Sequence, residues 1–385
     1  MTAPIYLDHH ATTPLDPRVL DAMLPWFREG FGNPHSVDHA YGWAAEEAVE
    51  AARRQVAALI GAEPREIVFT SGATEANNLA LRGVAPALAK AGRFGILASP
   101  LEHPCVMACL EALAADGFAV RFLPVGPAGL VDPAEVAARL GPDVGLVTVM
   151  AANHEIGTLQ PIDEIGRLAR AAGALIHVDA AQAAGKIPLS MREIDLMTLS
   201  AHKLYGPKGV GALAVRRAVR PRVRPLILGG GQEQGLRSGT VPAPLVVGFG
   251  AAATLAAAEM GAEAVRLVAH RDRLLAQLRT AGLPIRLHGD PARRLPGNIN
   301  FRVEGLDAEA IIARVRDRVA ISTGAACASA ERTPSTVLRA IGLDETAALG
   351  ALRIGLGRST GESDIDAAAA ALIEVCRELC RDKGA

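Results

Sequence analysis

The order of apolar segments between residues 45 and 215 constrains the fold of this chain more than any other feature. Short apolar runs typical of buried strands alternate there with helix-length segments whose apolar residues recur at helical spacing. The predicted strands are EIVFT at 66–70, GILAS at 95–99, AVRFLPV at 119–125, VGLVTVM at 144–150, ALIHVDA at 174–180 and DLMTLSA at 195–201. Strands alternating with helices predict right-handed crossovers, and therefore an α/β fold with a mainly parallel sheet covered on both faces.

The pattern changes after residue 258. A long charged helix is predicted at about 259–280, and the strand-like LPGNINFRVEG and further short units after it predict a smaller α+β domain. Residues 241–258 are uncharged, but their prolines, glycines and many alanines favour a buried helix over a membrane span. We place the large domain at residues 15–255 and the small domain at residues 1–14 and 256–385.

Charge and cysteine content exclude several classes of protein. The 40 Lys+Arg and 41 Asp+Glu residues give a formal net charge of -1, which leaves no general positive field for nucleic acid or an acidic membrane surface. Five cysteines are too few, and odd in number, for a disulfide framework. The N-terminal MTAPIYLDHHATTP lacks the basic and apolar regions of a secretory signal. We therefore expect a soluble, cytoplasmic protein that binds no nucleic acid directly and no membrane.

Three polar segments follow predicted strands, where an α/β sheet binds its ligands. SGATE at 71–75 offers small residues at a strand-to-helix turn, which suits either a phosphate or an ordinary helix cap. HVDAAQ at 177–182 ends a buried strand with Asp179, which needs a partner there or caps the next helix. SAHKLYGPKG at 200–209 places Lys203 at a strand end, a poor position for a solubilising lysine and a good one for a covalent amine.

Together the three segments predict pyridoxal 5'-phosphate as cofactor. A helix N-terminus would hold the phosphate, Asp179 would contact the pyridinium nitrogen, and Lys203 would form the Schiff base. His103 would lie in the same cleft, where an imidazole can stack on the ring and exchange protons, although a turn histidine is the plainer alternative. Asn153 and Gln182 suit the orientation of a ring oxygen, or equally a turn.

Three further segments contain candidate residues. The segment GGGQEQGLRSGT at 229–240 is polar and rich in glycine. Its glycines allow the backbone to approach a bound group closely, and Thr240 offers a hydrogen-bond donor for an anion. Arg353 is a candidate clamp for a substrate carboxylate. Cys327, in the small-residue segment ISTGAACASAERTPS, is predicted to lie on a mobile loop as a nucleophile. The cysteine pairs 105/109 and 376/380 have no zinc-type spacing, so we expect no metal site.

With these motifs, the sequence closely resembles the cysteine desulfurases of the class V aminotransferase family, the iron-sulfur-cluster and nitrogen-fixation type. The likeness runs through YLDHHATTP, FGNPHS, REIVFTSGATEANN, ANHEIGTLQP, HVDAAQ, SAHKLYGPKG, RSGT and LRIGLGR, and so covers nearly the whole chain. It implies the fold of pyridoxal-phosphate-dependent transferases, aspartate aminotransferase-like, with a large cofactor-binding domain and a small domain that carries the catalytic cysteine loop.

The resemblance also implies residue roles. Lys203 resembles the Schiff-base lysine, Asp179 the partner of the pyridinium nitrogen, and His103 the acid/base that stacks on the ring. The resemblance also implies further cofactor contacts. The phosphate would be bound by Ala73, Thr74, Ser200 and His202, the ring oxygen by Gln182, and the phosphate of the neighbouring subunit's cofactor by Thr240. Asn153 and Arg353 match the contacts to the substrate carboxylate, and Cys327 matches the persulfide-forming cysteine.

The implied reaction converts L-cysteine to L-alanine, with a persulfide on Cys327 that passes to an acceptor protein for iron-sulfur cluster assembly or thiolation. The implied assembly is a homodimer with shared sites. The chain lacks the extended C-terminal tail of housekeeping members, and His9, His10 and His154 differ from their pattern. The alternatives are a selenocysteine lyase or another pyridoxal-phosphate C–S lyase, and a non-catalytic cofactor-binding scaffold.

Overall fold

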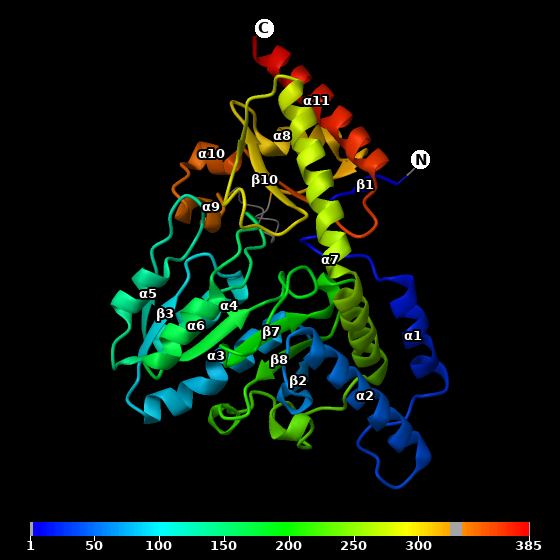
Figure 1. Ribbon diagram of the computed structural model, residues 1–385, viewed down its shortest axis with the longest axis vertical. Helices are drawn as coiled ribbons and strands as arrows, with labels where there is room; N and C mark the ends of the chain where they lie inside the picture. The colour runs from blue at the N-terminus through cyan, green and yellow to red at the C-terminus, as the bar shows by residue number, and fades with distance from the viewer. Residues whose placement is uncertain (1–2, 324–332, 385) are drawn as a thin grey trace.

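The computed structural model describes residues 3–323 and 333–384. Its largest element is a seven-stranded sheet with the strand order β2-β8-β7-β6-β5-β3-β4 (Figure 1). The strands are β2 (Ile67–Thr70), β3 (Gly95–Ala98), β4 (Ala119–Phe122), β5 (Val144–Thr148), β6 (Leu175–Asp179), β7 (Leu196–Ser200) and β8 (Gly211–Val215). The predicted mainly parallel sheet is confirmed, since only β8 runs antiparallel to its neighbours β2 and β7.

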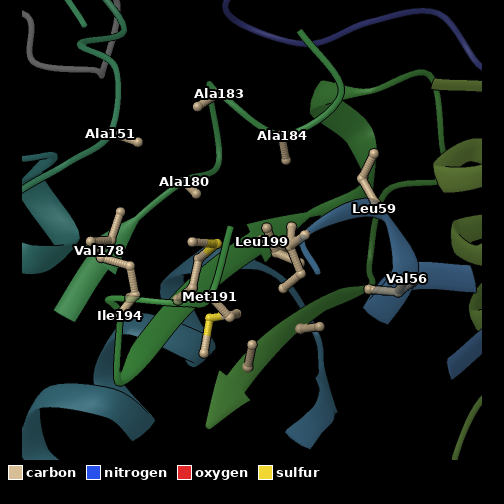
Figure 2. Close-up of a cluster of buried hydrophobic side chains, with 14 of the residues drawn as sticks. Val56, Leu59, Ala151, Val178, Ala180, Ala183, Ala184, Met191, Ile194 and Leu199 are labelled. Atoms are coloured by element: carbon tan, nitrogen blue, oxygen red, sulfur yellow. The ribbon is translucent and has the colours of Figure 1, made fainter. Parts of the chain in front are cut away.

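Helices cover both faces of this sheet, because successive residues of each buried strand point to opposite sides. Val68 and Leu146 pack with α3 (Ala73–Lys90) and α4 (Pro104–Ala115), whereas Phe69 and Val147 belong to the core on the other face. The helices of that second face are α1 (Pro17–Arg28), α2 (Ala40–Leu59), α5 (Pro133–Arg139) and α6 (Ile162–Ala171). Figure 2 shows its aliphatic and methionine side chains, as expected where aromatic residues are only 3% of the chain.

A second group of elements lies above the large sheet in Figure 1. The strands β9 (Ile285–Leu287), β10 (Asn298–Val303) and β12 (Ala351–Gly355) form an antiparallel sheet with β10 in the centre, and β1 (Ile5–Tyr6) pairs with β11 (Val319–Ala320). The helices here are α8 (Ala308–Val315), α9 (Thr336–Ala340), α10 (Glu345–Leu349) and α11 (Glu362–Gly384). This part has its own hydrophobic core around Phe301.

One helix, α7 (Ala243–Thr280), belongs to both parts. The sequence suggests a buried helix followed by a charged one, but the 38 residues form a single helix, and the proposed domain limit at 255/256 falls inside it. Phe249 packs in the core of the large sheet and Leu274 in the core around Phe301. Figure 1 shows α7 running from one part into the other. Among the described residues α7 alone is long and apolar enough to cross a membrane, and its N-terminal half instead packs against α1 and α2.

Candidate active site

A cavity of about 700 Å³ lies where the parallel strands of the large sheet end. One wall consists of the segments that follow β2, β3, β5, β6 and β7, at the carboxyl edge where α/β folds bind ligands. The opposite wall comes from the N-terminal segment, from residues 333–337 and from β12. The sequence-predicted residues among the lining are Ala73, Thr74, His103, Asp179, Gln182, Ser200, His202, Lys203 and Arg353.

The N-terminus of α3 forms one end of the cavity. Gly72 at the N-cap has no side chain to cap the helix, and the first helical bond runs from Ala76 N–H to the Gly72 carbonyl. The N–H groups of Ala73 and Thr74 precede that bond, so the helix itself does not use them. Ser200 and His202 line the same cavity, and burial together with nearby lysines lowers the pKa of His202 to about 4. Unused N–H groups, a helix dipole and two polar side chains suit a phosphate.

Asp179 is a buried carboxylate at the end of β6. Its Oδ1 accepts the Ala181 N–H at 2.9 Å and its Oδ2 accepts the Asn77 side chain at 2.8 Å. No salt bridge joins it to a cation in the parts of the chain that the structure describes. A buried carboxylate without an ion-pair partner is costly, so this side chain suits a cationic or protonated ring nitrogen in the cavity.

Lys203 follows β7 in a short 3-10 turn, Ala201–Lys203. Its Nζ donates to the main-chain carbonyls of His10 at 2.6 Å and Ala11 at 2.7 Å. These carbonyls belong to the N-terminal segment, which also bonds the turn through Thr13 and the Tyr205 N–H. The amine is therefore held at the cavity wall by a segment remote in sequence.

Gln182 is oriented by two neighbours that the sequence did not identify. Its Nε2 donates to the His10 carbonyl at 2.8 Å, and its Oε1 accepts from Lys186 Nζ at 3.1 Å and lies 3.2 Å from His10 Nδ1. Because an amide oxygen only accepts, His10 Nδ1 must carry the proton. Burial lowers the pKa of Lys186 to about 7.

His103 caps the N-terminus of α4. Its Nδ1 accepts the Cys105 N–H at 3.2 Å and lies 3.1 Å from Cys105 Sγ, so this nitrogen is an acceptor and the ring exchanges protons through Nε2. Burial lowers the pKa of His103, with the Lys203 charge acting in the same direction, although Asp179 opposes the shift. Its ring meets that of His154 edge-on, with centroids 5.3 Å apart. A neutral imidazole at this position can accept a proton near neutral pH.

Arg353 lies on β12 with its side chain only 4% exposed. It donates to Asp8 Oδ1 at 2.9 Å and to the His154 carbonyl at 3.2 Å. Glu102 and Glu155 also line the cavity, and burial raises the pKa of both carboxyl groups. Lys203 and Arg353 thus line a cavity in which burial shifts two carboxyl groups toward their neutral forms.

Two predicted residues do not line this cavity, and a third lies outside the described residues. Asn153 is buried, and its amide bonds the Leu101 carbonyl and the N–H groups of Glu155 and Ile156, so it forms the turn that was the alternative to ring contact. Thr240 is exposed on the Gly-rich segment. Cys327 lies outside the described residues. The roles implied for these three remain predictions.

Seven titratable lining residues had no predicted role, namely His10, Glu75, Glu102, Cys105, His154, Glu155 and Lys208. Each lies within a motif named above or within two positions of His103, which was a usable signal. Burial raises the pKa of Cys105 to about 12, so this thiol is not a thiolate at neutral pH.

The residues present fit pyridoxal 5'-phosphate. Asp179 is a buried carboxylate without an ion pair among the described residues, the first N–H groups of α3 are not used by the helix, and Lys203 lines the same cavity. The fit comes from four different strand ends and the N-terminal segment, so one binding mode explains groups that are otherwise unrelated.

Comparison with known proteins finds related chains over nearly the whole length. The family model for class V aminotransferases matches residues 5–368. A cysteine desulfurase from Homo sapiens is 50% identical over 365 residues, which cover 94% of this chain and 79% of the relative. A solved NifS-like protein is similar with a TM-score of 0.90 and 35% identity, covering 98% of this chain and 100% of that one. SspA, solved in complex with cysteine, is similar with a TM-score of 0.80 and 36% identity over 92% and 99% of the two chains.

Proposed function

This chain belongs to the class V aminotransferase family, and from that membership we propose that it is a pyridoxal-phosphate-dependent cysteine desulfurase that converts L-cysteine to L-alanine. One observation carries the proposal: Lys203, Asp179 and His103 line a single cavity beside the N-terminus of α3. The relative solved with cysteine supports the same substrate.

The cofactor's phosphate would be held by the N–H groups of Ala73 and Thr74 and by Ser200 and His202, its ring nitrogen by Asp179, and its ring oxygen by Gln182. When bound, pyridoxal 5'-phosphate supplies an electron sink for a carbanion on the substrate. Asp179 favours the protonated ring nitrogen because its buried negative charge has no other cationic partner in the described chain.

The chain's own residues bind the substrate and move its protons. Arg353 is placed to bind the carboxylate of cysteine. Lys203 Nζ has the His10 and Ala11 carbonyls within hydrogen-bond distance, so its amine is held at the cavity wall, where it would take and return a proton. His103 exchanges its proton through Nε2, because Nδ1 is occupied by the Cys105 N–H.

Cys327 is proposed as the nucleophile. Its thiolate attacks the sulfur of the substrate, the bond between that sulfur and Cβ breaks, and a persulfide remains on Cys327. The carbon skeleton gains a proton at Cβ from the Lys203 or His103 side of the cavity and leaves as alanine. The persulfide sulfur then passes to an acceptor protein, either a cluster scaffold or a thiolation enzyme.

A homodimer and a cytoplasmic location belong to the same proposal. The exposure of Thr240 supports the dimer, because this side chain is available to a second copy of the chain. The cysteines at 105, 109, 376 and 380 are free thiols, which supports a reducing compartment.

Incubation of the cofactor-loaded protein with L-cysteine tests the function. We expect alanine to form together with a protein-bound persulfide that a thiol reductant releases. Cys327→Ala should abolish both products, whereas Cys380→Ala, which replaces an exposed thiol outside the cavity, should behave as the wild type. Alanine formation by Cys327→Ala would indicate a general C–S lyase, and no alanine from the loaded wild type would indicate a non-catalytic scaffold.

A further inference from the structure

Asp8 contacts the guanidinium of Arg353 at the edge of the cavity. Its Oδ1 lies 2.9 Å from Arg353 NH2, and the two side chains are 18% and 4% exposed. Asp8 is part of the YLDHHATTP segment, from which the proposed reaction uses only main-chain carbonyls. An ion pair this well shielded from water restricts the arginine far more than a surface pair would.

Ser322 completes the contact on the other side of the carboxylate. Its Oγ donates to the same Asp8 Oδ1 at 3.2 Å. Its backbone pairs with that of Arg353, with the Arg353 N–H at 2.7 Å from the Ser322 carbonyl and the Ser322 N–H at 3.2 Å from the Arg353 carbonyl. Ser322 therefore holds the backbone of Arg353, and Asp8, which Ser322 also bonds, holds its side chain.

The backbone around Asp8 is itself fixed to β12. The Gly355 N–H donates to the Leu7 carbonyl at 2.8 Å, and the His9 N–H donates to the Gly355 carbonyl at 3.2 Å. These bonds flank Asp8 on both sides, so its backbone cannot move away from β12 without breaking main-chain pairing. The position of the guanidinium is thus set by the N-terminal segment.

We propose that Asp8 is the positioning residue for Arg353, and that with the His154 carbonyl it fixes the guanidinium so that its remaining N–H groups meet the substrate carboxylate. Asp8 uses NH2 and His154 uses NH1, which leaves the second N–H of each nitrogen for a ligand. This inference rests on the proposed function, because the carboxylate is that of cysteine.

The competing explanation is that the Asp8–Arg353 ion pair only stabilises the fold. The chain offers a control for this explanation. Asp16 also belongs to the N-terminal segment and pairs with an arginine just beyond β12, with Asp16 Oδ2 at 2.8 Å from Arg358 NH1. That pair is as well buried on the carboxylate side, at 5% exposure, but it does not line the cavity. Asp16→Ala therefore removes this buried ion pair, together with the Arg18 pair and the N-cap of α1, without touching Arg353, so it is a stricter control for a purely structural loss.

The test compares Asp8→Ala, Asp8→Asn and Asp16→Ala as cofactor-loaded enzymes. Asp8→Ala should raise KM for L-cysteine about tenfold with kcat within about threefold of wild type. Without Asp8 the Arg353 guanidinium loses its orientation, and the substrate carboxylate that it binds is held equally in the ground state and the transition state. Asp8→Asn keeps an acceptor oxygen for Ser322 and Arg353 and should restore KM to within about threefold. Asp16→Ala should leave KM unchanged.

Ligand binding without turnover gives a second measurement. Titrations of the loaded protein, followed by cofactor absorption, should show L-alanine binding weakened by the same factor in Asp8→Ala. Cysteamine, which is cysteine without its carboxylate, should bind equally to Asp8→Ala and wild type. If Asp8→Ala does not fold, Ser322→Ala should still raise KM, by about twofold or more, because it removes one bond that holds the carboxylate.

An unchanged KM in the Asp8 variants, or equal losses for alanine and cysteamine, would overturn the positioning role. The two proposals fail in different ways. If the wild type forms no alanine from cysteine, the desulfurase function is wrong, while the contrast between alanine and cysteamine still reports on Arg353. If the wild type turns over normally and the Asp8 variants show no carboxylate-dependent effect, only the positioning role is wrong.

Discussion

His177 makes the stability of this protein depend on pH between 4 and 6.5. It is fully buried in β6, with Nδ1 at 2.8 Å from Thr148 Oγ1 on β5 and Nε2 at 3.3 Å from Thr198 Oγ1 on β7. Burial lowers its pKa to about 4, although the nearby Asp179 opposes the shift. The unfolded chain therefore binds a proton that the folded chain excludes below pH 6.5, and stability falls as the pH is lowered.

The magnitude follows from the two pKa values. With an unfolded pKa of about 6.5 and a folded pKa of about 4, the loss between pH 7.5 and pH 5 is about 2 kcal/mol. For a chain of 385 residues the entropy of unfolding is about 0.8 kcal/mol per kelvin, so this loss corresponds to a fall of about 2–3 °C in Tm.

His177→Gln isolates this contribution, because an amide can bond the threonines but does not titrate. We expect Tm of the loaded wild type to fall about 2–3 °C further between pH 7.5 and pH 5 than Tm of His177→Gln. His35→Gln replaces an exposed histidine and should track the wild type. Equal losses in all three proteins would show that His177 is not held neutral and would refute the reasoning.

Three further predictions concern buried charges. Asp179→Asn should lower alanine formation on the order of a hundredfold and shift the cofactor absorption, since the carboxylate at the ring nitrogen is lost. Glu102→Gln should retain activity within about threefold in the same assay, because burial already favours the neutral carboxyl and the amide oxygen can still accept the Met150 N–H. Arg53→Met should cost about 3–5 kcal/mol in denaturant unfolding by leaving buried Glu233 unpaired, and adding Glu233→Gln should recover part of it.

The sequence located most of the large sheet but missed one strand. The six predicted strands correspond to β2–β7, and β8 at Gly211–Val215 was not among them. The connection from Ser200 to Gly211 is too short for a crossover helix, so β8 must run antiparallel to β7. Its place between β2 and β7 could not be predicted, because strand order depends on contacts remote in sequence. Likewise, α7 has no cap or break near residue 258, where composition alone suggested two helices.

In the candidate site, too, the sequence predicts which segments meet but not which residue of a segment faces the cavity. Strand ends converge at one edge of a sheet, which is why the sequence alone could group Asp179, Lys203 and His103. In the AANHEIG segment the structure turns His154 into the cavity and Asn153 away from it. The Asn153 Oδ1 accepts two N–H groups of the following turn, and this local bonding decides which neighbour faces the ligand. Spacing alone does not contain that information.

Burial gives the cavity its charge balance. It raises the pKa of Glu102 and Glu155 and lowers that of His103, His154 and His202, so in each of these lining groups burial shifts the equilibrium toward the neutral form. Lys203, Lys208, Arg353 and Asp179 line the same cavity, Glu75 there pairs with Arg237, and Asp8 lies just behind Arg353. Lys203 and Lys208 belong to the segment after β7 that would hold the phosphate, Arg353 would bind the substrate carboxylate, and Asp179 would contact the ring nitrogen. A site with this pattern attracts two anionic groups and one cationic ring at once, which is the combination that pyridoxal phosphate and an amino acid substrate present.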